Sequence, residues 1–149
     1  EFSKNKDYIK AELELHLHNI CRKLREEKLE TDIIGVMLRT KDFRVFYRCI
    51  NLNKACNSEI ELKSVINGLF DCIYTENIIY RASGIYAGNL KQEEKMQLCF
   101  FTDEEKTKIR KLSETLDKIE DKYGKGKIAT GVTGIREIKD KHKRIMNCK

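Results

Sequence analysis

Apolar residues in the first part of the chain follow a helical repeat. Between residues 9 and 29 they recur every three or four positions, at Ile9, Leu13, Leu17, Ile20 and Leu24. Side chains at this spacing share one face of an α-helix. The pattern predicts an amphipathic helix over this stretch.

Three runs of β-branched and aromatic residues follow. The first two, Asp32–Thr40 and Arg44–Leu52, are separated by the short polar link Lys41-Asp42. Such a pair predicts a β-hairpin. The third run, Ile78–Leu90, predicts another strand, and its glycines indicate a bulge or a close approach of the backbone.

Capping patterns predict two further helices. Ser58 followed by Glu61 resembles a capping box, in which the two side chains satisfy free amides at a helix start. Thr102 and Glu105 repeat this pattern, and Gly124 is a natural helix end. The apolar faces of these two helices comprise Leu62, Val65, Ile66, Leu69, Phe70 and Ile73 in the first and Ile109, Leu112, Leu116 and Ile119 in the second. A short helix around residues 135–145 is expected in the Lys-rich tail.

These elements predict an α+β fold with a small antiparallel sheet. Two long amphipathic helices can cover one face of a three-stranded sheet, which leaves the other face free to meet a partner. The length of 149 residues suits one domain and a C-terminal helical extension. The chain begins with Glu1 and not Met, so we expect it to be a piece of a longer protein.

Composition narrows the class of protein. Hydrophobic residues make up 40% of the chain and charged residues 36%, which predicts a small core under a charged surface. No apolar run approaches the roughly 18 residues that a membrane span needs, so we expect a soluble protein. The six cysteines form no CxxC pair and are expected to be reduced thiols in a cytoplasmic protein; they are Cys21, Cys49, Cys56, Cys72, Cys99 and Cys148.

The charge pattern suggests a polyanionic partner. The net charge is +6 and the pI is near 9.0. Guanidinium groups pair with phosphate oxygens, and Arg44, Phe46 and Arg48 would share one face of a strand. The candidate DNA-binding residues crowd the hairpin and the start of the third strand: Arg39, Lys41, Arg44, Arg48, Lys54 and Arg81. The alternative is an ordinary hydrated sheet face.

Catalytic motifs find little support. His16 and His18 are two apart on a helix and would diverge, which argues against a shared metal. The glycine- and lysine-rich stretch from 125 to 134 lacks the spacing of a phosphate-binding loop. We therefore expect no enzymatic activity, cofactor or metal for this chain on its own.

The order of segments resembles the C-terminal little-finger domain of Y-family (UmuC/DinB, ImpB/MucB/SamB) lesion-bypass DNA polymerases. The matching segments are spread over residues 2 to 128: Phe2-Ser3, Leu38-Arg39-Thr40-Lys41-Asp42-Phe43, Tyr47-Arg48, Ile79–Leu90, Gln97–Phe101 and Lys122–Gly126. The resemblance implies a DNA-binding domain over residues 1–92, a clamp-binding linker over 93–102 and a helical extension over 103–149. It also implies a nucleoid-associated polymerase, with Mg²⁺ held by a palm domain upstream of Glu1.

The resemblance implies two partners, primer–template DNA and the bacterial sliding clamp. DNA would be held along its backbone with little reading of sequence. The clamp would take the motif formed by Gln97, Leu98, Phe100 and Phe101; the alternative is that this pentad is a core strand of the domain.

The chain departs from the family pattern at its start. The family's domain opens with a strand before its first helix, and only Glu1-Phe2-Ser3 could remain of it here. An exposed sheet edge of this kind invites pairing with another chain, so we expect a dimer as one outcome. The rival interpretation is a non-enzymatic α+β interaction module that dimerises through such an edge or through the helix from Ile109 to Ile119.

Overall fold

A computed structural model describes residues 3–92, 104–124 and 128. The helices and strands follow the predicted order: α1 (Lys6–Glu26), β1 (Leu29–Thr40), β2 (Val45–Cys56), α2 (Glu59–Ile73), β3 (Tyr80–Gln92) and α3 (Glu104–Tyr123). The pentad Gln97–Phe101 and the short helix expected around residues 135–145 lie outside the described residues.

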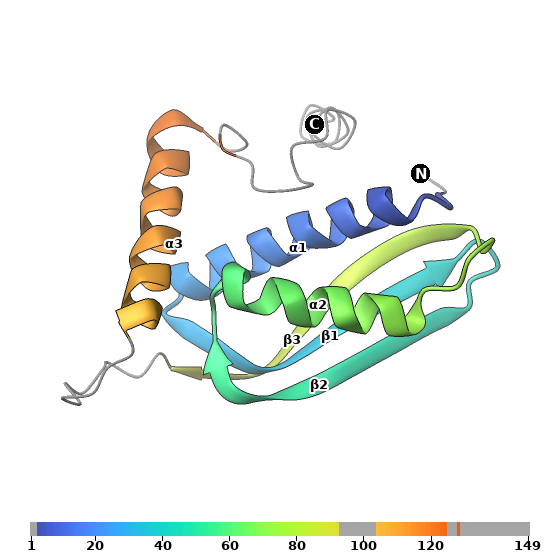
Figure 1. Ribbon diagram of the computed structural model, residues 1–149, viewed down its shortest axis with the longest axis horizontal. Coiled ribbons are helices and arrows are strands. Elements are labelled where there is room, and N and C mark those ends of the chain that lie inside the picture. Colours follow the sequence, from blue (N-terminus) through green and yellow to red (C-terminus); the bar gives the residue numbers. More distant parts are fainter. Residues whose placement is uncertain (1–2, 93–103, 125–127, 129–149) are drawn as a thin grey trace.

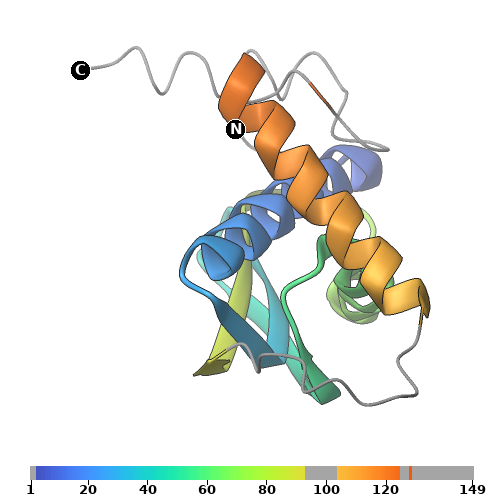
Figure 2. The same ribbon diagram turned by 90° about the vertical axis from the view of Figure 1, so that its left-hand side faces the viewer.

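The strands form a three-stranded antiparallel sheet in the order β2-β1-β3. Helices α1 and α2 lie on one side of this sheet (Figures 1 and 2), which confirms the predicted α+β class. The β1–β2 hairpin closes where the Thr40 amide donates to the Arg44 carbonyl oxygen at 2.9 Å. Phe43, in this turn, has a φ of 65°.

Ser3 makes the contact expected of a shortened first strand. It forms an antiparallel bridge with Tyr80, in which each amide donates to the other carbonyl oxygen, at 2.9 and 3.0 Å. The bridge lies on the outer edge of β3, because the other edge of β3 pairs with β1. Next to the bridge, Asn5 starts α1 by accepting hydrogen bonds from the amides of Asp7 and Tyr8.

The core lies between the two helices and the sheet. Alternate residues of β1 point to the helices, because side chains in a strand alternate between faces. Side chains of both helices fill the space above them. The core comprises Ile9, Leu13, Leu17, Cys21, Ile34, Val36, Leu38, Leu62, Ile66, Leu69, Phe70 and Tyr80.

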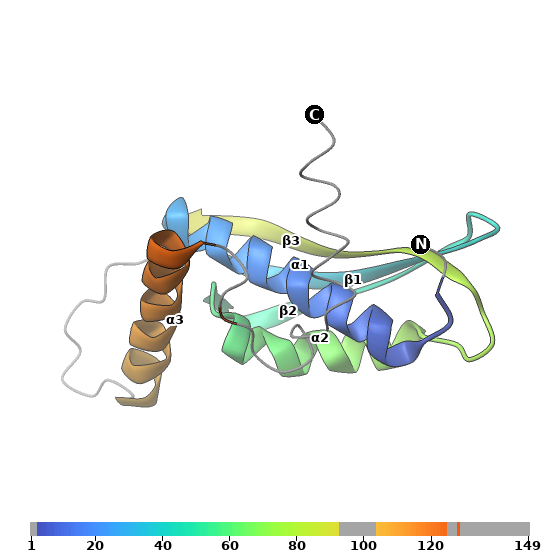
Figure 3. The ribbon, with the colours of Figure 1, turned by 90° about the horizontal axis from the view of Figure 1, so that it is seen from above.

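Ion pairs connect α1 and α2 along their length. His18 contacts Glu59 at 2.7 Å, Glu14 contacts Lys63 at 3.2 Å, and Lys10 contacts Asp71 at 3.3 Å. Residue numbers fall along α1 as they rise along α2, so the two helices run antiparallel (Figure 3). The pairs are one helical turn apart on α1, and one and then two turns apart on α2, as the 3.6-residue period requires.

The capping box predicted at the start of α2 does not form. The helix begins after Ser58, as expected, but the Ser58 hydroxyl makes no capping hydrogen bond and is buried without a partner. The carboxylate of Glu61 instead accepts from the Cys56 thiol at 3.0 Å. Burial raises the pKa of this thiol to about 12, so it stays protonated and able to donate.

The predicted inward face of α3 is wrong at Leu112, whose residue is 50% exposed. Among the α3 side chains that the structure describes, the buried ones are Ser113 and Glu120, whereas Leu116 is half-buried. The reason is the partner of α3, which is the charged side of α1 and not the sheet (Figure 2). Apolar periodicity on α3 therefore identified half-buried residues at Ile109, Leu116 and Ile119 but missed the two buried polar ones.

Candidate nucleic-acid interface

The side of the sheet that faces away from α1 and α2 carries none of the described helices, and we call it the open face (Figure 2). On β1, Ile34, Val36 and Leu38 point to the helices and are fully buried. The residues between and after them, Gly35, Met37 and Arg39, therefore lie on the open face.

The strand register defines the rest of the open face. Met37 is paired with Tyr47 on β2 and with Gly84 on β3. Gly35 is paired with Cys49 and Tyr86, and Arg39 with Val45 and Ala82. Because paired residues in an antiparallel sheet project from the same face, these three rows form one surface.

Two tyrosines dominate the centre of the open face. Tyr47 is 51% exposed and Tyr86 50% exposed, and their rings meet edge to face with centroids 6.5 Å apart. A hydrogen bond with Cys49 is the main cause that raises the pKa of Tyr47 above its ordinary value. The phenol therefore stays neutral at physiological pH and can donate a hydrogen bond to an anion.

Glycines keep the open face shallow. A Cβ atom at Gly35 would lie 2.8 Å from the Cβ of Cys49 and 3.0 Å from the carbonyl oxygen of Arg48. A Cβ atom at Gly88 would lie 2.5 Å from the Tyr86 hydroxyl oxygen, because the tyrosine lies over this glycine. In the third strand, Gly88 thus marks a position where the side chain of Tyr86 lies close over the backbone.

Four of the six predicted DNA-binding residues gather at the hairpin end of the sheet. Arg39 ends the open face there, and its Nε is buried with no hydrogen-bond partner in the described part of the chain. Arg81 lies at the irregularity in the β1–β3 pairing, with its guanidinium 4.4 Å from the ring centroid of Phe43. Lys41 and Arg44 lie in the turn, where the Lys41 amide donates to the Ile79 carbonyl oxygen at 2.9 Å and Arg44 is 3.9 Å from Asp42.

The other two predicted residues lie elsewhere on β2. Arg48 is paired with Val36, so it is on the helix side of the sheet, exposed at the outer edge. Phe46 has the same orientation and packs against the core, so the face shared by Arg44, Phe46 and Arg48 is not the open one. Lys54 is ten residues beyond Arg44, which in a strand is about 30 Å.

The sequence analysis missed the aromatic part of this surface. Tyr47 and Tyr86 are exposed on the open face, yet neither was a candidate site residue. The available signal was the alternation along β1, which assigns Ile34, Val36 and Leu38 to the core and so assigns their neighbours to the opposite face. Pairing those neighbours with Tyr47 and Tyr86 additionally requires the strand register.

The predicted clamp-binding residues Gln97, Leu98, Phe100 and Phe101 lie outside the described residues. In the part of the chain that is described, none of the helices combines the length and apolar character that crossing a bilayer demands.

Comparison with known proteins places this fold in a family. Residues 2–100 match the impB/mucB/samB family C-terminal domain. The DNA polymerase IV of Dehalococcoides mccartyi strain 195 is 27% identical over 139 residues, which cover 88% of this chain and 33% of that protein. The DNA polymerase IV proteins of strains BAV1 and CBDB1 are 27% and 26% identical with the same coverage.

The matched region and the described fold agree. Residues 2–100 include α1, the complete three-stranded sheet and α2, and they make up more than half of the 149 residues. The chain spans about a third of the length of the polymerases that it matches. It belongs to the impB/mucB/samB family and carries the C-terminal domain of a Y-family DNA polymerase.

Proposed function

We propose that this domain holds primer–template DNA along its phosphate backbone, within a Y-family polymerase that copies past damaged bases. The observation that carries the proposal is the open face, a shallow sheet surface that α1, α2 and α3 leave uncovered and that ends near a group of cationic side chains. Arg39 lies at this end of the open face, and Lys41, Arg44 and Arg81 lie next to it at the hairpin end of the sheet.

The chemistry of this surface suits phosphate more than base edges. Guanidinium groups bind phosphate oxygens through paired, charge-assisted hydrogen bonds. Arg39, at the end of the open face, supplies one such guanidinium group. The hydroxyls of Tyr47 and Tyr86 add neutral donors, and contacts of this kind fix position without reading sequence.

The proposed activity of the whole protein is DNA polymerisation, and the support for it is the family match and the names of the relatives. The matched relatives are DNA polymerase IV proteins, of which this chain spans a third. In this proposal nucleotide transfer and its Mg²⁺ ions belong to a palm domain outside this chain. The domain described here contributes grip on the DNA and no catalytic group.

The proposed second partner is the sliding clamp. The segment Gln97–Phe101 has an amide side chain followed by a pair of aromatic residues, a pattern that suits an extended peptide filling an apolar pocket. Replacing Phe100 and Phe101 by alanine should abolish clamp binding, since each large apolar side chain contributes about 1.5–3 kcal/mol when buried. Loss of folding in this variant would indicate a core strand instead.

Salt titration of DNA binding tests the main proposal. The chain alone should bind a primer–template duplex with a Kd on the order of 10⁻⁴ to 10⁻⁶ M, and log K should fall with log salt by about 0.9 per phosphate contact. Arg39→Ala and Arg44→Ala should each weaken binding and lower the slope by about one contact. The matched control is Lys23→Ala, which removes an exposed charge from α1, on the helix side.

Two outcomes would overturn the proposal. One is an affinity that does not change with salt. The other is an equal loss of binding in Lys23→Ala and Arg39→Ala, which would mean that net charge and not the open face binds DNA. Size-exclusion chromatography of the same samples tests the rival proposal, self-association through the outer edges of β2 and β3.

A further inference from the structure

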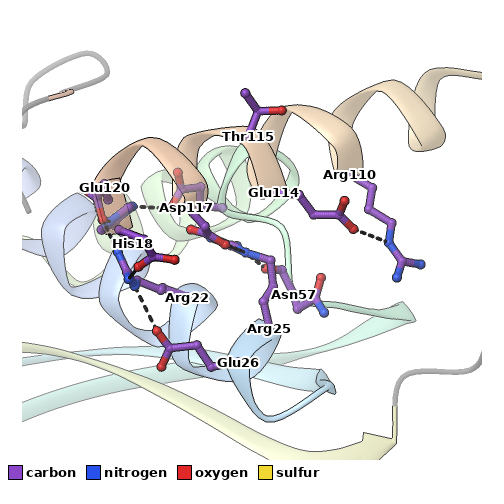
Figure 4. Close-up of polar contacts among 12 residues, drawn as sticks. His18, Arg22, Arg25, Glu26, Asn57, Arg110, Glu114, Thr115, Asp117 and Glu120 are labelled. Carbon is purple, nitrogen blue, oxygen red and sulfur yellow. Dashed lines mark hydrogen bonds and ion pairs between the residues drawn. The ribbon is translucent and has the colours of Figure 1, made fainter. Parts of the chain in front are cut away.

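Helix α3 is attached to the domain through charged side chains of α1. It crosses the C-terminal half of α1 (Figure 2), and Figure 4 shows the contacts from the side. Arg25 donates to both carboxylate oxygens of Asp117, at 2.7 and 2.8 Å, and to the Asn57 carbonyl oxygen at 2.9 Å. Arg25 thereby joins α1, α3 and the segment that leads into α2.

A second arginine and a buried carboxylate lie one turn away. Arg22 donates to Glu120 at 2.5 Å and also contacts Asp121. The Glu120 side chain is only 7% exposed and that of Arg22 only 11%, so this pair is shielded from water. An interaction between shielded charges is strong only while every charge keeps its partner.

His18 connects this cluster to α2. Its Nδ1 is 2.7 Å from Glu59 of α2, and its Nε2 is 3.2 Å from the same Glu120 oxygen that Arg22 contacts. A carboxylate can only accept hydrogen bonds, whereas a neutral imidazole has one donor and one acceptor. Both contacts are hydrogen bonds only when both ring nitrogens carry a proton.

We propose that α3 attaches reversibly to α1 through ion pairs. This attachment is stronger when His18 is doubly protonated between Glu59 and Glu120. When His18 loses a proton, one ring nitrogen turns a lone pair toward a carboxylate. The longer contact, to Glu120, is the one that gives way. Arg22 and Arg25 keep their carboxylate partners, so the attachment of α3 is weakened but not abolished.

The charges around His18 set the direction of this response. Glu59 of α2 and Glu120 of α3 both face His18. Asp117 and Asp121 of α3 are paired with Arg25 and Arg22. On α1 itself Glu14, paired with Lys63, precedes His18 by one turn, and Arg22 follows by one turn. The hydrogen bond with Glu59, supported by the charge of Glu120, raises the pKa of His18 above its ordinary value of 6.5 although burial opposes this.

The sign of the effect follows from proton linkage. The share of the raised pKa that Glu120 contributes exists only while α3 is attached. Attachment is therefore strongest below the ordinary pKa of histidine and weakens as the pH rises through the higher pKa of the attached form. The total weakening should be about tenfold, as expected for the loss of one charge-assisted hydrogen bond.

Hydrogen exchange of the full chain tests the proposal. After correction for the intrinsic pH dependence of exchange, amides of α3 should lose about tenfold in protection between about pH 6 and pH 8.5. Amides of β1 should keep theirs. Raising the salt concentration at either pH should lower the protection of α3 further, because salt screens exposed parts of the ion pairs.

Two histidine variants make the test specific. His18→Gln should already show weakened protection of α3 at the lower pH and no further change with pH. His16→Gln, two positions earlier on the same helix, should respond like the unmodified protein. A pH-independent α3 in the unmodified protein, or a normal pH response in His18→Gln, would overturn the proposal.

A variant in α3 leaves the sequence of α1 unchanged and so distinguishes loss of the contact from misfolding of α1. Glu120→Gln should remove the pH response of α3, and the NMR titration of the His18 ring should move to lower pH. If that titration is unchanged in Glu120→Gln, the two side chains are not coupled and the attachment of α3 does not depend on His18.

Discussion

Helix α1 makes two interfaces that differ in kind. Toward the sheet and α2 it buries the apolar side chains of Ile9, Leu13 and Leu17. Toward α3 it presents Arg22 and Arg25, with His18 between α2 and α3. One helix thus belongs to a core formed by hydrocarbon contacts and to a contact formed by charges.

The difference teaches how the two parts of the molecule respond to solution conditions. Apolar burial contributes about 25 cal/mol per Å² and is insensitive to pH and to moderate salt. Ion pairs depend on protonation and on screening, and removing one partner of a shielded pair costs more than the pair contributes. We therefore expect the sheet with α1 and α2 to unfold as one unit, while α3 detaches at a lower free energy.

The largest effect should come from the apolar interface. Phe70 on α2 is fully buried and stacks on Tyr74 with ring centroids 5.1 Å apart. Phe70→Ala should lower the free energy of unfolding by about 3–5 kcal/mol, measured by urea denaturation. Ile60→Ala, in the same helix but 41% exposed, is the control and should cost under about 1 kcal/mol. Similar losses in both variants would mean that α2 is not packed as described.

The next largest effect should come from the charged interface between α1 and α3, and it should be confined to α3. A double-mutant cycle of Arg25→Ala and Asp117→Ala should give a coupling free energy of about 2–3 kcal/mol in the exchange of α3 amides. The midpoint of global unfolding should change little. The exposed pair Arg110–Glu114 within α3 is the comparison and should couple by under about 0.5 kcal/mol. Equal coupling in α3 and in the sheet would refute the division into two interfaces.

Two glycine variants should change the stability of the sheet and α2 by smaller amounts and leave the attachment of α3 unchanged. Gly35→Ala forces a methyl group against Cys49 and the backbone of Arg48, so it should lower global stability by about 1–2 kcal/mol without loosening α3. Gly68→Ala on α2 meets no atom within 4 Å and should raise stability by up to about 1 kcal/mol. Thermal unfolding of both variants checks the opposite signs.

The smallest effect belongs to the exposed ion pairs between α1 and α2. The hydrogen bond with Lys6, at 2.9 Å, lowers the pKa of Asp71, and both side chains are about half exposed. Asp71→Asn should cost at most about 0.5 kcal/mol near pH 7. Because the pKa is lower in the folded state, this contribution is present above the unfolded value of about 3.9 and disappears as the pH falls through the folded value. A cost that persists in acid or in high salt would contradict the assignment.

Local patterns predicted the elements because the core obeys them. The helical repeat through Leu13 and Leu17 and the runs around the β1–β2 hairpin gave the right elements in the right order. The failures occurred where a contact outside the helix itself decides the outcome. Glu61 binds the Cys56 thiol and not the start of its own helix, and α3 buries Glu120 because arginines of α1 lie opposite.

The candidate site was predictable only in part for a similar reason. The positions of arginine and lysine in the sequence identified the cationic side chains of the hairpin, among them Arg39 and Arg44. The side of the sheet on which a residue of β2 lies depends on its register with β1. That register directs Phe46 and Arg48 to the helix side and brings Tyr47 to the open face, which residue type alone does not reveal.

The polar character of the α1–α3 contact has a consequence for solubility. A helix that leaves an apolar groove exposes hydrocarbon, and molecules opened in this way adhere to one another. Separation of α3 uncovers the polar side chains of His18, Arg22 and Arg25, which water hydrates readily. Separation at this contact should therefore favour aggregation less than exposure of the core would.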